Sequence, residues 1–143
     1  MKEFRVLICG DRHWTDYLAI KDLMIKLCQV YKSSLVIIEG EAHGADIMAA
    51  QAAEELGVPD SRILRFPVTK QDWNSLGKSA GHLRNRKMLI EGKPNLVFAF
   101  HDSLEFSKGT ANMVNQSRKA GVPVKLIHHS LDGSGEIKLA QIT

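Results

Sequence analysis

The chain alternates short apolar runs with longer helical patterns, and this alternation limits the folds it can adopt more than any other feature. The helical patterns carry apolar residues at spacings of three and four, as in Ile20, Leu23, Met24 and Leu27. Parallel strands joined by right-handed helical crossovers account for such an alternation. The sequence therefore predicts an α/β fold in three layers with a mostly parallel five-stranded sheet. The expected strands are Phe4–Cys9, Leu35–Ile38, Arg62–Phe66, Asn95–Phe100 and Val124–Ile127.

The composition is that of one globular domain. Of the 143 residues, 44% are apolar and 24% are charged. We expect a single domain over 1–143, with its core in 4–127, while 128–143 form an extra edge strand or a tail. A net charge of +3 without a basic run does not indicate nucleic acid. Cys9 and Cys28 should be reduced core residues. No apolar stretch reaches about 18 residues and no signal pattern is present, so we expect a cytoplasmic protein without a membrane span.

The stretch from Leu35 to Leu56 predicts a strand, a tight loop and a helix. Gly40 and Gly44 in the loop permit close approach of a ligand to the main chain. The first amides of the following helix attract an anion, which favours a phosphate-bearing ligand. Taken alone, a single such loop favours the alternative of an ordinary connection between strand and helix. Repetition of the pattern at other strand ends favours the phosphate hypothesis.

Four loops should converge at the carboxyl edge of the sheet, where such folds bind ligands: Gly10–Thr15, Glu39–Asp46, Val68–Ser79 and His101–Thr110. The third is long enough to be a binding loop. Glycines in or beside these loops leave room for backbone contacts, and basic residues offer charge-assisted bonds to phosphate. Two tryptophans could stack on a base or serve packing. These residues are Gly10, Gly40, Gly44, Gly109, Arg12, Lys78, Arg84, Lys108, Trp14 and Trp73.

Arg84 is the most informative single residue, because it shares one line of a predicted helix with Ala80 and Met88. A charge among apolar neighbours needs a partner. That partner is either a ligand phosphate or an internal carboxylate such as Asp46.

Carboxylates near the same edge could act as a general base, or could satisfy amides and solvent instead. The candidates are Glu39, Glu41, Asp46 and Asp102. The six histidines lack the spacing of a metal site, so we expect no metal and no cofactor.

Five motifs taken together resemble the YspA-like, cpYpsA-related branch of the SLOG superfamily, whose Rossmann-like domains are related to the LOG phosphoribohydrolases and to the DNA-processing protein DprA. The resemblance covers residues 4 to 127. The motifs are Gly10-Asp11-Arg12, Glu39-Gly40-x-Ala42-x-Gly44-Ala45-Asp46, Trp73, Lys78-Ser79-Ala80-Gly81-x-x-Arg84-Asn85-x-x-Met88 and Lys108-Gly109-Thr110.

The resemblance implies a pocket for nucleotides or nucleotide-derived molecules. In the LOG enzymes a catalytic glutamate follows the Gly-Thr element, whereas here Ala111-Asn112-Met113 follow Thr110. We therefore expect a sensor or a sequestering protein. The alternatives are an N-glycosidase of the phosphoribohydrolase type and a DprA-like DNA-binding module, and relatives imply a homodimer. The expected ligand-binding residues are Gly10, Asp11, Arg12, Trp14, Glu39, Gly40, Gly44, Ala45, Asp46, Trp73, Lys78, Ser79, Gly81, Arg84, Asn85, His101, Ser107, Lys108, Gly109 and Thr110.

Overall fold

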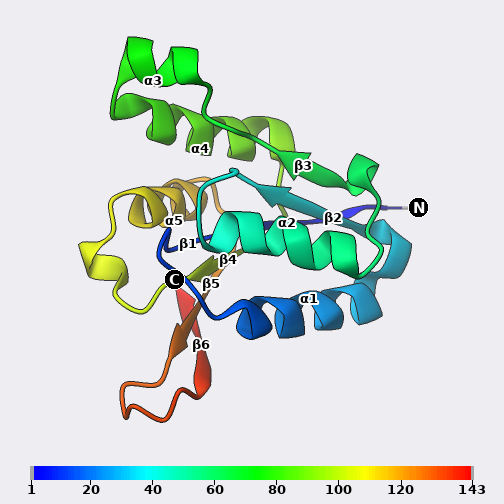
Figure 1. Cartoon of the computed structure of the whole chain (residues 1–143). Helices are drawn as coiled ribbons and strands as arrows, with labels where there is room; N and C mark the ends of the chain where they lie inside the picture. Colours follow the sequence, from blue (N-terminus) through cyan, green and yellow to red (C-terminus); the bar gives the residue numbers. More distant parts are fainter. Residues whose placement is uncertain (1, 143) are drawn as a thin grey trace.

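The fold is known from a computed structural model that describes residues 2–142. Within these residues, helices cover both faces of one twisted sheet (Figure 1). The strands are β1 (Phe4–Gly10), β2 (Leu35–Glu39), β3 (Ile63–Arg65), β4 (Leu96–Phe100), β5 (Val124–His129) and β6 (Ile137–Ile142). The helices are α1 (Tyr17–Tyr31), α2 (Ala45–Glu55), α3 (Lys70–Leu76), α4 (Ser79–Gly92) and α5 (Gly109–Lys119).

The sheet has the strand order β3-β2-β1-β4-β5-β6, in which the first five strands are parallel and β6 is antiparallel to β5. This arrangement confirms the predicted three-layer α/β fold. It also confirms the edge-strand alternative for the C-terminal segment. The chain leaves the centre in one direction through β2 and β3 and in the other through β4 and β5. The direction changes between β1 and β4, and sheets of this kind bind ligands outside the carboxyl ends of the strands at such a point.

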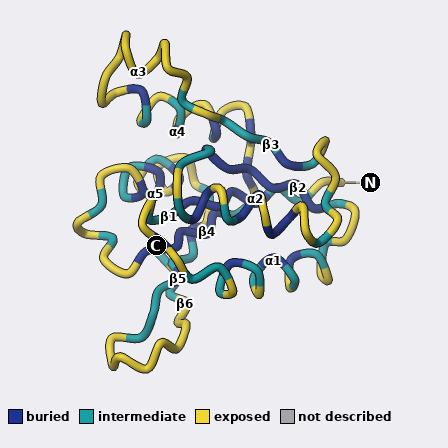
Figure 2. The backbone as a smooth tube through the Cα atoms, in the orientation of Figure 1, coloured by how far each residue is buried: buried dark blue, intermediate teal, exposed yellow. Residues whose placement is uncertain are grey.

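Alternate residues of β1 enter two separate cores, as the two-residue period of a strand requires. Val6 and Ile8 pack with α1 and α2, whereas Leu7 and Cys9 pack with side chains of α4 and α5. Figure 2 shows the sheet as the buried centre of the molecule. Both faces are therefore covered, which explains why the strands are apolar runs and not alternating patterns.

Small residues set the spacing between α2 and the sheet. Ala45, Ala49, Ala52 and Ala53 are fully buried, as their helical spacing predicted. The amphipathic helix α1 is likewise confirmed, with the carboxylate of Asp16 accepting the N–H of Ala19 at its start. These two helices form one layer.

The long polar loop predicted at Val68–Ser79 is wrong, because most of it forms α3. Thr69 accepts the N–H of Asp72 at 3.0 Å and caps the helix, and Gly77 ends it at a φ of +57°. The side chains of α3 are all exposed, so the sequence has no apolar periodicity that would have predicted this helix. Figure 1 shows α3 standing on α4, away from the sheet. Among residues 2–142, none of the helices combines the length and apolarity needed to cross a membrane.

The close contact of β1 with β4 makes a prediction for Gly10. A Cβ at Gly10 would lie 2.4 Å from the carbonyl oxygen of Phe100 and 2.8 Å from Cβ of Ala45. Gly10→Ala should therefore lower the free energy of unfolding by about 1–3 kcal/mol in urea titrations. Gly81→Ala is the matched control, because no described atom lies within 4 Å of its added Cβ. This helical position should gain up to about 1 kcal/mol, and equal losses at both sites would contradict the packing argument.

Candidate functional site

The loops after β1 and β4 meet at the predicted carboxyl edge. The N–H of Asp11 donates to the carbonyl oxygen of Phe100 at 2.8 Å, and the N–H of Ala45, at the start of α2, donates to the carbonyl oxygen of Asp11 at 3.3 Å. The backbone of Asp11, directly after β1, thus joins the last residue of β4 to the first residue of α2. The structure confirms that these loops share an edge, and it shows that they contact one another directly.

Protein atoms fill the space beside three of the five glycines that were expected to bind a ligand. A Cβ at Gly44 would lie 2.3 Å from the carbonyl oxygen of Asp11, and Gly44 has a φ of +83°. A Cβ at Gly40 would lie 2.7 Å from Nη1 of Arg84. With the contact of Gly10 described above, close packing of the protein explains all three glycines. Ligand contact at these positions stays a prediction.

Carboxyl groups of the protein accept the amides of the loop after β2. Asp46 accepts the N–H of Gly40 at 3.0 Å and also that of Ala42, while Glu39 accepts the N–H of Glu41 at 2.9 Å. A phosphate would have to displace these carboxyl groups to use the same amides. The loop therefore holds internal acceptors where an anion from solution was expected.

Burial changes the acidity of both carboxyl groups. Glu39 is 0% exposed, and burial, a hydrogen bond with the side chain of Glu41 and the charge of Asp46 raise the pKa of Glu39 to about 9, although the N–H of Glu41 opposes this shift. Burial also raises the pKa of Asp46 to about 6, although the charge of Arg84 and the amides of Gly40 and Ala42 oppose this shift. Glu39 is therefore a neutral carboxylic acid at pH 7, and Asp46 is mostly ionised.

Arg84 binds main-chain carbonyl groups, which neither alternative for its partner had anticipated. Its Nη1 donates to the carbonyl oxygen of Gly40 and, at 3.4 Å, to that of Phe66. No ion pair between Arg84 and Asp46 falls within 4.0 Å in the described part of the chain. Arg84 thus ties the ends of β2 and β3 to α4.

Asn85 continues this connection to α5. It is buried, and its amide donates to the carbonyl oxygen of Gly109 at 3.3 Å and to Oδ1 of Asn112 at 3.1 Å. Its own Oδ1 accepts Nε of Arg84 at 3.1 Å. Two successive residues of α4 therefore fix the positions of three loops at the carboxyl edge.

Trp14 packs inside the protein, as one of the two alternatives for it proposed. It is 4% exposed, it stacks on the ring of His129 at 4.7 Å, and it meets Phe100 edge-on at 5.4 Å. Its indole N–H donates to the carbonyl oxygen of Asp16 at 2.9 Å. Base stacking by Trp14 would require this packing to open. Trp73, in contrast, is 52% exposed on α3.

His129 lies between two carboxylates that sequence reasoning did not connect with it. Its Nδ1 lies 2.8 Å from Oδ2 of Asp102, and its Nε2 lies 2.8 Å from Oδ2 of Asp16. These hydrogen bonds raise the pKa of His129, which favours the charged imidazolium. The three residues are distant in sequence and belong to no motif, so only the fold brings them together.

Asp11 and His101 lie close together directly after the carboxyl ends of β1 and β4. Nδ1 of His101 accepts the N–H of Ser103 at 2.9 Å, which leaves the proton of a neutral ring on Nε2. This Nε2 lies 3.9 Å from Oδ2 of Asp11. The pair offers a donor and an acceptor to a polar ligand at this point.

The start of α5 is accessible from solvent. Ser107 accepts the N–H of Thr110 at 3.0 Å, but Gly109 is exposed and no described atom lies within 4 Å of its added Cβ. Lys108 precedes it and is exposed. Lys78 and Ser79, at the start of α4, and Arg12, after β1, are also exposed, whereas Gly81 is partly buried. Within residues 2–142, Arg12, Lys78 and Lys108 form no ion pair within 4.0 Å. Three unpaired cations therefore lie on loops of one edge.

Comparison with known sequences identifies relatives. Residues 4–66 match the family described as YAcAr, the YspA, cpYpsA-related SLOG family. The Gene 61 protein of Mycobacterium phage D29 is 36% identical over 124 residues, which are 84% of this chain and 93% of the phage protein.

Comparison with solved structures shows the same fold. DprA from Streptococcus pneumoniae matches with a TM-score of 0.66 and 20% identity over 93% of this chain. This chain spans 53% of that protein. DprA from Helicobacter pylori, described for its single-stranded DNA binding mode, has a TM-score of 0.64 and 19% identity over 92% of this chain and 68% of that one. The Moco carrier protein of Chlamydomonas rheinhardtii has a TM-score of 0.53 and 17% identity over 86% of this chain and 74% of that one.

Glu39 gives a prediction for pH dependence. A carboxyl group whose pKa is higher in the folded than in the unfolded chain stabilises the fold below its ordinary pKa of 4.5, and this stability is lost as the pH rises through about 9. Glu39→Gln keeps a neutral side chain, so above pH 7 the variant should be more stable than the parent, by on the order of 1–3 kcal/mol. Urea unfolding from pH 5 to 9 measures the difference. Exposed Glu105→Gln is the control, and a pH-independent difference at Glu39 would contradict the burial argument.

Arg84 gives a prediction that separates a structural role from ligand binding. Arg84→Ala removes the bonds to Gly40 and Phe66 and leaves buried Asp46 without its nearest favourable charge. We expect a loss of about 2–4 kcal/mol in the free energy of unfolding without any ligand. Arg86→Ala, on the exposed side of the same helix, is the matched control and should change stability by less than about 0.5 kcal/mol. If both variants unfold alike, Arg84 is free to bind a ligand.

Proposed function

Because the chain belongs to the YspA, cpYpsA-related SLOG family, we propose that it binds a nucleotide or nucleotide-derived small molecule at the carboxyl edge of its sheet. The single observation that carries this proposal is the start of α5. There, exposed Gly109 leaves open space beside unpaired Lys108. An anion at this position gains from the partial positive charge of the helix end and from the lysine. A phosphate fits the start of α5 better than the loop after β2, because the neutral hydroxyl of Ser107 accepts the N–H groups of Thr110 and Ala111, whereas carboxyl groups accept those of the loop.

Asp11 and His101 could bind the sugar or base of such a ligand. Nε2 of His101 can donate a hydrogen bond and Asp11 can accept one, which suits the hydroxyl groups of a sugar or the edge of a base. Arg12, on the same loop as Asp11, adds charge for a second phosphate. The ligand would extend from the end of β1 to the start of α5.

Binding without turnover agrees best with the chemistry of these residues. Asn112, in the segment where the LOG enzymes have their glutamate, bonds to Asn85 and Gln116 and has no proton to transfer at neutral pH. Glu39 and Asp46 already accept loop amides. A hydrolase would need one of these carboxyl groups to leave its amides, so the enzyme alternative ranks lower. We infer a sensor or a sequestering protein.

Single-stranded DNA is a second candidate, and the exposed groups favour it specifically. The unpaired cations Arg12, Lys78 and Lys108 could contact successive phosphates, and exposed Trp73 on α3 could stack on a base. DprA from Helicobacter pylori is described with a single-stranded DNA binding mode, and it shares the fold at 19% identity. The small net charge weighs against this candidate.

Thermal melting with ligand panels tests the proposal. Nucleoside mono- and diphosphates should raise the melting temperature by mass action, while the free nucleosides should do so weakly, because phosphate supplies the main contacts. Lys108→Ala should weaken nucleotide binding about ten- to a hundredfold, the usual effect of losing one charge-assisted bond. Lys26→Ala, an exposed change on α1, is the matched control.

The same titrations discriminate the two candidates. A nucleotide that binds through a few contacts keeps most of its affinity between 50 and 200 mM salt, whereas a strand of DNA that contacts several phosphates loses affinity steeply, by roughly tenfold or more. Stabilisation that ignores the phosphate group would contradict the nucleotide proposal. Tighter binding of a DNA strand, reduced by Trp73→Ala, would place the second candidate first.

A further inference from the structure

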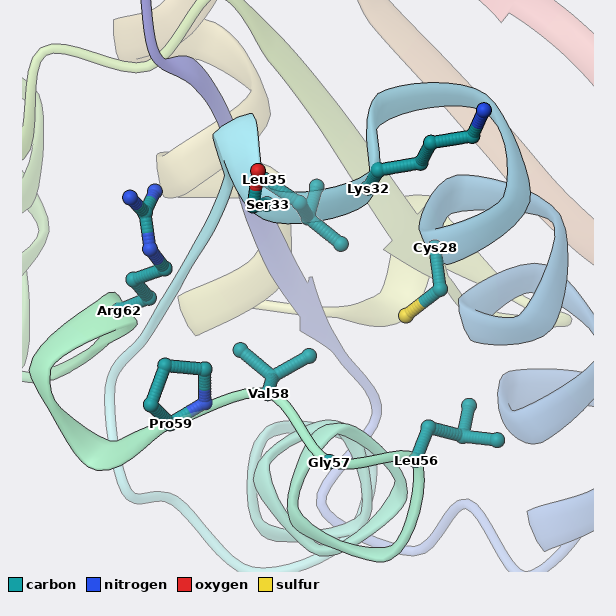
Figure 3. Close-up of a pocket in the computed structure, with 9 residues that line it drawn as sticks. All are labelled: Cys28, Lys32, Ser33, Leu35, Leu56, Gly57, Val58, Pro59 and Arg62. Atoms are coloured by element: carbon teal, nitrogen blue, oxygen red, sulfur yellow. The ribbon is translucent and has the colours of Figure 1, made fainter. Parts of the chain in front are cut away.

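A cavity lies at the amino edge of the sheet, at the opposite ends of the strands from the glycine loops. Its volume is about 320 Å³, near the lower limit of small-molecule pockets. The end of α1, the first residue of β2 and the segment after α2 form its walls (Figure 3). Figure 3 shows Arg62 on one side and Cys28 and Lys32 on the other. Nothing in the proposed function uses this cavity.

Arg62 brings an unsatisfied donor to this cavity. Nη1 of its guanidinium is buried, and the structure gives it no hydrogen-bond partner among the residues described. A buried charged donor without an acceptor is costly, and native proteins pair such groups with protein, water or a ligand. Arg62 lines the cavity, so an anion there lies beside the guanidinium charge, and a turn of the side chain would bring the enclosed Nη1 to a ligand oxygen.

The charges around the cavity favour an anion. Neither Arg62 nor Lys32 forms an ion pair within 4.0 Å anywhere in residues 2–142. Asp60, the nearest carboxylate to Arg62 in sequence, bonds to Arg65 at 3.2 Å. The ends of α1 and α2 also lie here, and their negative dipole ends oppose an anion. That effect is weakened because terminal carbonyl groups already have donors: Ala53 and Glu54 accept the N–H groups of Val58 and Gly57, and Tyr31 accepts the hydroxyl of Ser34.

Apart from Ser33, the remaining walls are mostly apolar. Leu35 is buried at the base of the cavity, and Leu56, Val58 and Pro59 line it from the segment after α2. Carbon surface of this kind binds an apolar body and contributes no specific polar contact. The cavity therefore combines an apolar wall with two positively charged residues, Arg62 and Lys32.

We propose that the amino edge is a second binding site, which takes a small organic anion with a flat apolar body and one acidic group bonded to Arg62. The acidic group lies at the guanidinium, and Lys32 adds a second positive charge. The apolar body covers Leu35 and Val58. This site is separate from the carboxyl edge, so it stands whether or not the chain binds nucleotides.

A matched pair of fluorescent probes tests the site. Anilinonaphthalene sulfonate has the required flat body and acid, and N-phenylnaphthylamine has a similar body without the acid. The sulfonate should bind the folded chain at least tenfold more tightly than the amine. Arg62→Ala should remove this preference, Lys32→Gln should reduce it several-fold, and Lys26→Gln on the same helix should leave it unchanged. Melting curves verify that each variant is folded. If Arg62→Ala does not fold, Lys32→Gln carries the test alone.

Cys28 locates the probe, because its thiol lines the cavity and is partly exposed while Cys9 is buried. Bound sulfonate should slow alkylation of Cys28 by iodoacetamide at least several-fold, as measured by peptide mass spectrometry. Equal affinity for the two probes, an unchanged preference in folded Arg62→Ala or in Lys32→Gln, or unprotected Cys28 would each overturn the proposal. Nucleotide-induced stabilisation should be the same in Lys32→Gln as in the parent, which keeps the two sites distinguishable.

Discussion

The burial of two carboxyl groups at the end of β2 is the constraint on which the rest of the carboxyl edge depends. Glu39 and Asp46 lie below the surface and accept the amides of the loop that separates them. Each acceptor satisfies backbone groups that would otherwise be buried without partners. The arrangement requires Gly40 to have no side chain, because the guanidinium of Arg84 and the carboxylate of Asp46 occupy that space. The glycine at position 40, the conformation of the loop and the acidity of the two carboxyl groups therefore depend on one another.

Helix α4 connects these buried groups to both halves of the sheet. Arg84 reaches the strands on one side of β1, and Asn85 reaches α5 on the other side. On the opposite face, His129 joins the end of β5 to the start of α1 and to the loop after β4 through Asp16 and Asp102. The loops at the candidate site are thus held by protein contacts before any ligand arrives. A preformed site of this kind loses little conformational entropy on binding.

The sequence predicted the layers well because they depend on local pattern. Apolar runs gave the parallel strands, and the alanines at 45, 49, 52 and 53 gave the close helix. It failed at α3, whose exposed side chains carry no apolar period, although Thr69 and Asp72 had the spacing of a helix cap. It also could not tell whether the space at Gly10 or Gly44 admits a ligand or a neighbouring loop, since both demand glycine. The clusters around His129 and Arg62 join distant residues, and no local pattern encodes them.

The position of α3 has a consequence for how the molecule moves. This seven-residue helix packs mainly on α4 and contributes no buried side chain to either core. A helix of this length is not stable by itself, so its backbone hydrogen bonds last only while it rests on α4. It can therefore unfold locally while the sheet stays intact, as the weakest cooperative units of native proteins do. Fast exchange of its amide hydrogens with solvent would accompany such opening. The segment that leads from β3 to Lys78, before α4, would then be a longer and more flexible loop, while the rest of the fold stays intact.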